Sequence, residues 1–342
     1  MSKIFLQACA AEPTAYTPIW LNRQAGRYMP EYHAVKGSGS SLEFFKDPER
    51  AARATLDAQR ILGVDAAIMF ADLLPILEPM GLRLEYVAGE GPLFHNPVRT
   101  AADVQALVVS PALEATPYIA QTVKNVLSEL PKDVALIGFA GAPFTLASYA
   151  VEGKGSRDYL RVKRMMYQAP ELWHALLDKL VAQVTSYVEL QIDSGVHAVQ
   201  LFDSWVGCLS LRDFDQYVLP HVQRLMNNLR GRVPIIYFGT GNAHLLDSTA
   251  RARPDVLALD WRVPLASTWQ RLGVTAVQGN LDPIVLCADR ATVESQAKAL
   301  LDEVGGRPGH IFNLGHGIVP ETPVDNVKAL VDFVHEYSAR RA

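Results

Sequence analysis

The chain has 342 residues, of which 49% are hydrophobic and 20% are charged, and its formal net charge is −4. This length can bury a large core, in one large domain or in two smaller ones. The mild acidity argues against nucleic-acid binding, which needs a basic face, and no apolar run reaches transmembrane length. We therefore expect neither a nucleic-acid partner nor a membrane partner.

The three cysteines, Cys9, Cys208 and Cys287, are scattered along the chain and have no CxxC or HxC spacing. This pattern supports neither a disulfide framework nor a zinc site. Reduced thiols indicate a cytoplasmic protein, and the N-terminal residues do not resemble a signal peptide. We expect a cytoplasmic protein without a bound metal.

Eight short hydrophobic runs are predicted to be strands. Most are continuous rather than alternating, which is typical of parallel strands covered on both faces. A further small pair of strands is expected around residues 82–87. The eight runs span residues 18–21, 66–71, 135–139, 197–202, 234–238, 256–259, 275–278 and 310–313.

The stretches between these runs have the pattern of helices. Asp47 and the proline after it form a helix start, and Gly63 can end that helix. A long helix begins at Pro170, carries apolar residues at i, i+4 spacing and ends before Gly195. A last helix covers residues 324–337.

Strands that alternate with helices predict an α/β fold, here a (β/α)8 TIM barrel that forms a single domain over residues 1–342. The alternative is an open, doubly wound sheet, but no GxGxxG motif opens a helix after the first strand. In a (β/α)8 barrel, the active site is built at the C-terminal ends of the strands. The residues that follow each predicted strand are therefore the candidates for function.

Two arginines follow the first predicted strand. Arg23 and Arg27 are four positions apart, and Gly26 between them allows the loop to bend. A buried guanidinium is costly unless an anion pairs with it. The pair therefore predicts a clamp for a carboxylate or a phosphate.

Polar residues also follow other predicted strands. Asp72, Tyr149, Ser204 and His316 lie after the second, third, fourth and eighth runs. Each has an ordinary structural alternative: Asp72 as a helix cap, Tyr149 as a core residue, Ser204 as a turn former, and His316 as a structural hydrogen-bonding residue. Their shared position at the same end of the barrel favours one common site.

Several familiar catalytic patterns are missing from the sequence, including HExxH, GxSxG and the Walker A loop. No lysine lies at any of the eight strand ends, which argues against a Schiff base. The remaining candidates supply two guanidinium groups, a carboxylate, a phenol, a hydroxyl and an imidazole. Such a set can bind a polyanion and stabilise one cationic centre.

At these positions the chain resembles the uroporphyrinogen decarboxylase family, and the resemblance covers nearly the whole chain. Five blocks occur in the family's order, which makes the signal highly specific. They are residues 19–32 (IWLNRQAGRYMPEY), 65–72 (DAAIMFAD), 138–146 (GFAGAPFTL), 278–283 (QGNLDP) and 313–317 (NLGHG).

The resemblance implies a cofactor-free, usually homodimeric enzyme. Such an enzyme removes CO2 from the four acetate side chains of uroporphyrinogen III and yields coproporphyrinogen III. By motif position, Arg23 and Arg27 would bind substrate carboxylates, and Asp72 would face the pyrrole N–H groups. The catalytic set implied is Asp72, Arg23 and Tyr149, and the other substrate-binding residues are Gln24, Ser204 and His316.

Three residues depart from the family pattern. Asn22 and Ala150 stand where methionine is usual, and Phe144 stands where tryptophan is frequent. None of these changes removes an expected polar site residue, so we expect them to affect packing around the first loop more than the chemistry.

The expected chemistry needs an electron sink, and a pyrrole protonated on a ring carbon supplies one. An ionised Asp72 would stabilise the resulting cation, and a nearby arginine would lower the pKa of Asp72. Arg23 is expected to orient the reacting acetate and to assist proton transfer. His316, Tyr149 and an Arg23-bound water stay open as proton donors.

Two other functions stay open. One is a zinc-dependent methyltransferase on a related barrel, for which Cys208 and Cys287 lack a His-x-Cys partner. The other is a tetrapyrrole-binding protein without catalytic activity.

Overall fold

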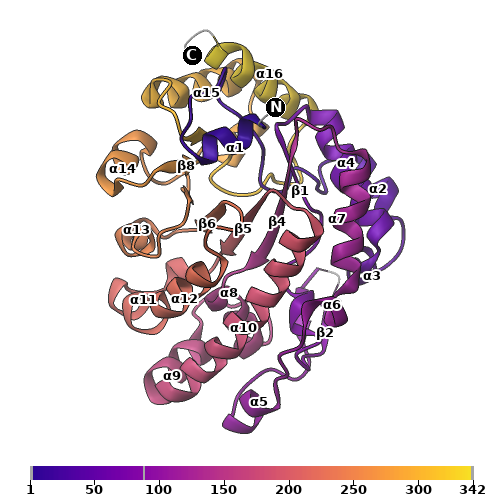
Figure 1. The fold of residues 1–342 in the computed structure, drawn as a ribbon, viewed down its shortest axis with the longest axis vertical. Coiled ribbons are helices and arrows are strands. Elements are labelled where there is room, and N and C mark those ends of the chain that lie inside the picture. Colours follow the sequence, from indigo (N-terminus) through magenta and orange to yellow (C-terminus); the bar gives the residue numbers. More distant parts are fainter. Residues whose placement is uncertain (1–2, 88, 340–342) are drawn as a thin grey trace.

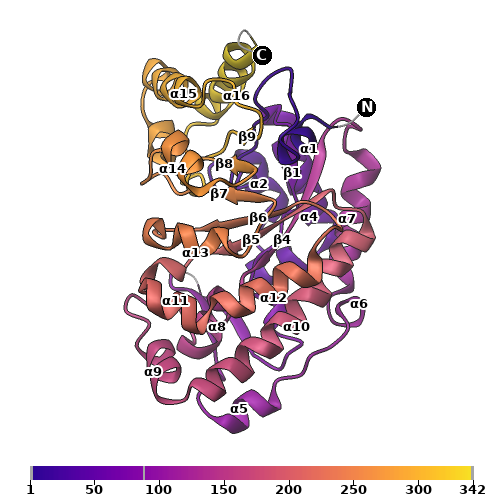
Figure 2. The same cartoon turned by 60° about the vertical axis from the view of Figure 1, so that its left-hand side comes forward.

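The computed structural model describes residues 3–87 and 89–339. Its centre is a curved, entirely parallel sheet in the order β1-β4-β5-β6-β7-β8-β9, with helices around the outside (Figures 1 and 2). The strands are β1 (Ala66–Ile68), β4 (Ala135–Gly141), β5 (Ala198–Asp203), β6 (Ile235–Gly239), β7 (Val256–Ala258), β8 (Ala276–Gln278) and β9 (His310–Ile311).

The first predicted strand, residues 18–21, is reduced to an extended segment with one parallel bridge, between Ile19 and Phe312. The Phe312 amide donates to the Pro18 carbonyl at 2.8 Å, and the Asp65 amide donates to the Ile19 carbonyl at 2.9 Å. The segment therefore connects β9 to the residue before β1, which are the two edges of the sheet. The predicted barrel is confirmed, with seven regular strands and this short closing segment.

The helices begin and end largely where the sequence predicts. Asp47 caps α4 by accepting hydrogen bonds from the amides of Glu49 and Arg50, and Gly63 follows it in the left-handed conformation. Gly195, with φ 114°, ends the 25-residue helix α10. The α-helices are α1 (Ile4–Cys9), α2 (Pro30–Lys36), α3 (Ser41–Lys46), α4 (Pro48–Leu62), α5 (Ala101–Ala106), α6 (Ala112–Ala115), α7 (Pro117–Glu129), α8 (Pro143–Glu152), α9 (Leu160–Gln168), α10 (Pro170–Ser194), α11 (Leu211–Tyr217), α12 (Leu219–Leu229), α13 (Leu246–Ala250), α14 (Leu265–Leu272), α15 (Arg290–Val304) and α16 (Val324–Ala339).

The described part of the chain also contains four short 3-10 helices, and each follows a strand or precedes a helix. They are η1 (Pro75–Leu77), η2 (Val206–Cys208), η3 (Ala243–Leu245) and η4 (Pro283–Cys287). Within the described residues, no helix combines the length and the apolar character needed to cross a membrane.

The predicted small pair of strands is an antiparallel hairpin of β2 (Leu84–Val87) and β3 (Gly91–Phe94), apart from the main sheet (Figure 1). The Phe94 amide donates to the Gly153 carbonyl at 2.7 Å, and the Val98 amide donates to the Ala150 carbonyl at 2.8 Å. These two bonds tie the hairpin and the residues after it to α8, the helix that follows β4.

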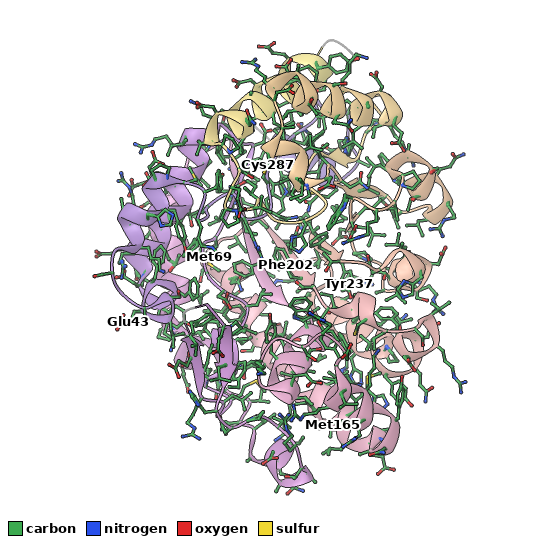
Figure 3. All side chains as sticks on the ribbon, turned by 180° about the vertical axis from the view of Figure 1, so that it is seen from behind. Glu43, Met69, Met165, Phe202, Tyr237 and Cys287 are labelled. Carbon is green, nitrogen blue, oxygen red and sulfur yellow. The ribbon has the colours of Figure 1, made fainter. Side chains whose placement is uncertain are left out.

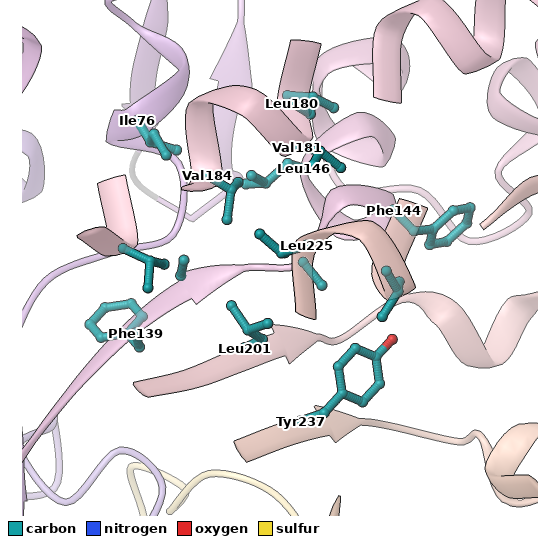
Figure 4. Close-up of a cluster of buried hydrophobic side chains, with 14 of the residues drawn as sticks. Ile76, Phe139, Phe144, Leu146, Leu180, Val181, Val184, Leu201, Leu225 and Tyr237 are labelled. Carbon is teal, nitrogen blue, oxygen red and sulfur yellow. The ribbon is translucent and has the colours of Figure 1, made fainter. Parts of the chain in front are cut away.

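The main core lies between the sheet and its covering helices. Figure 4 shows Leu201 of β5 on the side of the sheet that faces Val181 and Val184 of α10. Each fully buried side chain of this size contributes about 1.5–3 kcal/mol relative to an exposed one. This packing explains why the strand sequences are apolar on both faces, and it holds the strand ends that carry the site.

Candidate active site

The predicted site residues come from five separate segments, each of which follows a strand or the closing segment at the C-terminal end of the parallel sheet. Arg23, Gln24 and Arg27 follow the closing segment, and Asp72 follows β1. The others follow β4, β5 and β9, and they are Tyr149 on α8, Ser204 and His316.

The loop that carries the arginines has a specific backbone conformation. Arg23 has φ 62°, a left-handed conformation that is unfavourable for a residue with a side chain. A Cβ on Gly26 would lie 2.9 Å from the Arg23 carbonyl oxygen, so this tight turn requires glycine there. The turn directs Arg23 and Arg27 away from the core, and both residues remain exposed.

Gln24 is predicted to bind substrate. Its side chain is buried, with 1% of its surface exposed. Its Oε1 accepts from the Leu21 amide at 3.1 Å, and its Nε2 donates to the Ala66 carbonyl at 3.1 Å. Because both ends of this side-chain amide bind the backbone, Gln24 fixes the arginine loop to β1.

Asn22, the departure from the family pattern, is part of a hydrogen-bonded chain inside the barrel. Gln200 donates from Nε2 to Asn22 Oδ1, and Gln278 donates from Nε2 to Gln200 Oε1, both at 2.9 Å. Trp20 donates to the other end of this chain, at Gln278 Oε1. The backbone amide of Asn22 also donates to Asn313 Oδ1 at 3.0 Å. The residue before Arg23 is thus fixed by Gln200 of β5 and by Asn313, which follows β9.

The glycines around His316 allow two close approaches. A Cβ on Gly315 would lie 2.2 Å from the Trp261 amide nitrogen, and one on Gly317 would lie 2.3 Å from Arg23 Cδ. The loop after β9 therefore lies directly against the Arg23 side chain. Burial, with the positive charge of Arg23 as the next cause, lowers the pKa of His316 and favours a neutral imidazole.

Asp72 is half-buried, and its Oδ1 accepts two hydrogen bonds. The Tyr86 hydroxyl donates at 2.5 Å and the Leu74 amide donates at 3.0 Å. Arg23 and both donors favour the ionised carboxylate, but burial outweighs them and raises the pKa of Asp72. The expected lowering by an arginine is present, but desolvation is the larger cause and the net shift of the pKa is upward.

Arg23, Asp72 and Tyr149 influence one another electrostatically. Burial and the neighbouring Arg27 lower the pKa of Arg23, while Asp72 and Tyr149 raise it. Burial, with a smaller contribution from Asp72, raises the pKa of Tyr149 to about 12. Arg23 contacts solvent and is still partly desolvated. Tyr149 stays protonated and can donate a hydrogen bond.

Aromatic rings line the ends of three adjacent strands. Phe202 on β5 packs edge-on against Phe139 of β4 and Phe238 of β6, with ring centroids 5.8 and 6.0 Å apart. Phe202 is only partly buried and lies near the middle of the molecule in Figure 3. Ser204 follows it two residues later, and its carbonyl accepts from Thr240 Oγ1 at 2.5 Å. The site thus combines an apolar surface with polar groups.

The other two departures from the family pattern are packing positions. Phe144 is fully buried and contacts the rings of Tyr159 and Trp173. Ala150 is fully buried, and its carbonyl binds the Val98 amide. The prediction that these changes affect packing is consistent with both positions.

Sequence reasoning missed Tyr86, Gln200 and Tyr32. Tyr86 lies on the predicted small pair of strands, far from any predicted strand end of the barrel. Gln200 is a polar residue inside an apolar run, which is itself a signal of a buried hydrogen-bonding role. Tyr32 responds electrostatically to both Arg27 and Asp72, so it lies near the same charges.

Among residues 3–87 and 89–339, no group of three or more His, Cys, Asp or Glu side chains is arranged to hold a metal ion. Burial raises the pKa of the Cys208 thiol to about 11, which disfavours the thiolate that binds metals.

Comparison with known proteins identifies the family. The profile described as uroporphyrinogen decarboxylase (URO-D) matches residues 2–337. The chain belongs to the uroporphyrinogen decarboxylase family. The uroporphyrinogen decarboxylase of Carboxydothermus hydrogenoformans is 50% identical over 341 residues, which covers 99% of this chain and 97% of the relative. That of Sorangium cellulosum is 51% identical over 333 residues and covers 97% and 95%, respectively.

Among solved structures, a methyltransferase from Methanosarcina mazei superposes with a TM-score of 0.83 at 20% sequence identity, over 98% of this chain and 99% of that one. A putative vitamin-B12-independent methionine synthase from Listeria monocytogenes has a TM-score of 0.58 at 11% identity, over 98% and 99%. At these identities the likeness concerns the fold alone, and it agrees with the barrel found in this chain.

Proposed function

We propose that this chain is a carboxy-lyase that converts uroporphyrinogen III into coproporphyrinogen III by replacing four acetate side chains with methyl groups. The observation that carries the proposal is the 50% identity over 99% of the chain to a protein named uroporphyrinogen decarboxylase. The arrangement of Arg23 beside a half-buried Asp72 supports it. This places the chain in porphyrin and haem biosynthesis.

The reaction needs a place for the electron pair of the bond that breaks. A proton adds to the α carbon of the pyrrole ring, next to the carbon that bears the acetate, and the positive charge is shared between the acetate-bearing carbon and the ring nitrogen. The bond between the methylene and the carboxylate then breaks, CO2 leaves, and its electron pair neutralises the ring cation. A proton adds to the exocyclic methylene and the ring proton leaves, so one proton replaces each CO2. The protonated pyrrole takes the part that a cofactor has in other decarboxylases.

We assign Asp72 to the ring nitrogen. A carboxylate in a partly desolvated site stabilises a developing cation more strongly than it would in water. Two hydrogen bonds and Arg23 favour the ionised form of Asp72 and oppose the effect of burial. Asp72 therefore supplies the fixed negative charge that the cationic intermediate needs.

The guanidinium groups are assigned to the substrate's carboxylates. Arg23 and Arg27 are exposed on one short loop, where bidentate pairing with carboxylates is possible. Tyr149 and a neutral His316 are further hydrogen-bond donors, and Ser204 contributes a hydroxyl. The proton donor stays open among Tyr149, His316 and a water bound by Arg23, with Arg23 itself assisting the transfer.

An anaerobic assay of the purified protein with enzymatically generated uroporphyrinogen III tests the function. Products are oxidised to porphyrins and separated by carboxylate number. Stepwise loss down to four carboxylates, without added metal, is the expected result. Binding without loss of carboxylates would favour the tetrapyrrole carrier, and methyl transfer that depends on zinc would favour the methyltransferase. A homodimer and a cytoplasmic location stay predictions.

A further inference from the structure

Asp72 is held through one of its two oxygens. Both the Tyr86 hydroxyl and the Leu74 amide donate to Oδ1. Among the described residues, no side chain donates a hydrogen bond to Oδ2. The Leu73 amide is a further backbone donor to this carboxylate. The one side-chain donor among the described residues, Tyr86, holds Oδ1, so no side chain competes with a ligand for Oδ2.

The Tyr86 contact is short and comes from a separate element. The O–H···O distance is 2.5 Å, which is typical of a hydrogen bond to a charged acceptor. Tyr86 lies on β2, opposite Pro92 of β3, outside the main barrel sheet. Burial, together with the charge of Asp72, raises the pKa of the Tyr86 phenol, so it remains protonated and donates.

Packing fixes the Tyr86 ring from two directions. Phe45 of α3 contacts it edge-on, with centroids 5.4 Å apart, and Phe45 in turn contacts Phe70 at 5.7 Å. The hairpin is also bound to α8 through the hydrogen bond from Phe94 to Gly153. The phenol is thus held on a rigid support rather than on a mobile loop, which is what orienting a reactive group requires.

We infer that Tyr86 is the positioning residue of Asp72: its phenol holds Oδ1 so that Oδ2 faces the pyrrole N–H groups of the porphyrinogen. This inference rests on the proposed function for the identity of the ligand. It deepens that function by giving the hairpin a part in catalysis, since the hairpin supplies the donor that orients Asp72 and favours its ionised form. Tyr86 contacts the reacting groups only through Asp72.

The test replaces Tyr86 with Phe, which removes the hydroxyl and keeps the ring. Loss of a hydrogen bond to a charged acceptor is expected to lower kcat about tenfold to hundredfold, with KM within about twofold of wild type. The acidic limb of the pH profile should move to higher pH, because Asp72 loses a donor that favours its ionised form. Arg23, Tyr32, Tyr149 and Tyr187 also interact with Asp72, and all four are unchanged in this variant.

Tyr16→Phe is the matched control. Tyr16 donates to Asp65 Oδ1 at 2.9 Å, and Asp65 directly precedes β1, whereas Asp72 follows β1. Each variant thus removes one tyrosine–aspartate hydrogen bond at one end of the same strand. Tyr16→Phe is expected to lower the Tm and to leave kcat and the pH profile unchanged. If Tyr86→Phe also lowered only the Tm, the inference would be wrong.

A measurement that does not use turnover separates this inference from the proposed function. In protein labelled with carbon-13 at aspartate carboxyls, the Asp72 resonance is identified by its loss in Asp72→Asn. Its pKa is expected to rise in Tyr86→Phe and to stay constant in Tyr16→Phe. Incorporation of 3-fluorotyrosine at position 86, a stronger donor, should move the pKa in the opposite direction, and an unchanged pKa in both variants would overturn the inference. An inactive wild-type protein would contradict only the proposed function.

Discussion

Gly317→Ala should displace the Arg23 side chain without unfolding the protein. The new Cβ would lie 2.3 Å from Arg23 Cδ and 2.7 Å from Cγ, whereas ordinary contacts begin at 3.4 Å. The side chain must therefore move by about 1 Å to relieve the clash. A misplacement of this size can reduce catalysis by about a hundredfold. We expect kcat/KM for uroporphyrinogen III to fall by about that factor.

The assay compares kcat/KM with the Tm for Gly317→Ala and for Gly155→Ala, where a Cβ would meet no atom within 4 Å. Arg23 is exposed, so its movement should cost little stability, and both variants should melt near the wild-type temperature. Gly155→Ala should keep wild-type kcat/KM. A folded Gly317→Ala enzyme with wild-type kcat/KM would refute the assignment of Arg23 to the reacting carboxylate.

Three further predictions follow from buried polar groups. Asp72→Asn should cost at least about 3 kcal/mol of transition-state stabilisation, measured as kcat/KM, and near wild-type activity would contradict the charge-stabilising role. Gln200→Leu removes the hydrogen-bond partner of Asn22 Oδ1 and of Gln278 Nε2. Each unpaired group should lower the free energy of unfolding, measured in urea, by about 1–3 kcal/mol. An unchanged free energy of unfolding would show that the chain relaxes around the gap. Burial raises the pKa of Asp203 from 3.8 to about 6, so the folded state binds this proton more tightly than the unfolded state. The resulting stabilisation, about 3 kcal/mol, is complete below pH 3.8 and is lost as pH rises through about 6. Asp203→Asn should abolish the change in unfolding free energy between pH 3.8 and about 6. The same pH dependence of the unfolding free energy in the variant as in the wild type would contradict this prediction.

The sequence predicts the barrel well, because its strands are continuous apolar runs and its helices have clear starts and ends. Asp47 and Gly63 are where the sequence places a helix cap and a helix end. Several strands are shorter than predicted, and the first one, residues 18–21, makes a single bridge before the chain turns into the arginine loop. There the tight left-handed turn at Arg23 ends the strand, and a pattern of apolar residues does not contain that information.

Polar residues were harder to assign than apolar ones, because their role depends on which partner lies nearby. Gln24 lies directly beside Arg23 in the sequence, yet its side-chain amide binds the Leu21 backbone amide and the Ala66 carbonyl. Tyr86 is far from any barrel strand in the sequence, yet its hydroxyl is bonded to Asp72. Proximity along the chain does not show how the Gln24 side chain is used, and only the packing of the hairpin beside the barrel brings Tyr86 to Asp72.

The opposite charges at the site depend on each other. Burial favours the neutral form of both Arg23 and Asp72, and each group opposes that effect in the other. Removing the charge of Asp72 therefore also weakens the charged form of Arg23, so a single substitution changes two groups. The loss measured for Asp72→Asn will include part of the contribution of Arg23, and only a double-mutant cycle with Arg23→Lys separates the two. A coupling energy near zero in that cycle would mean that the guanidinium and the carboxylate act on different parts of the substrate.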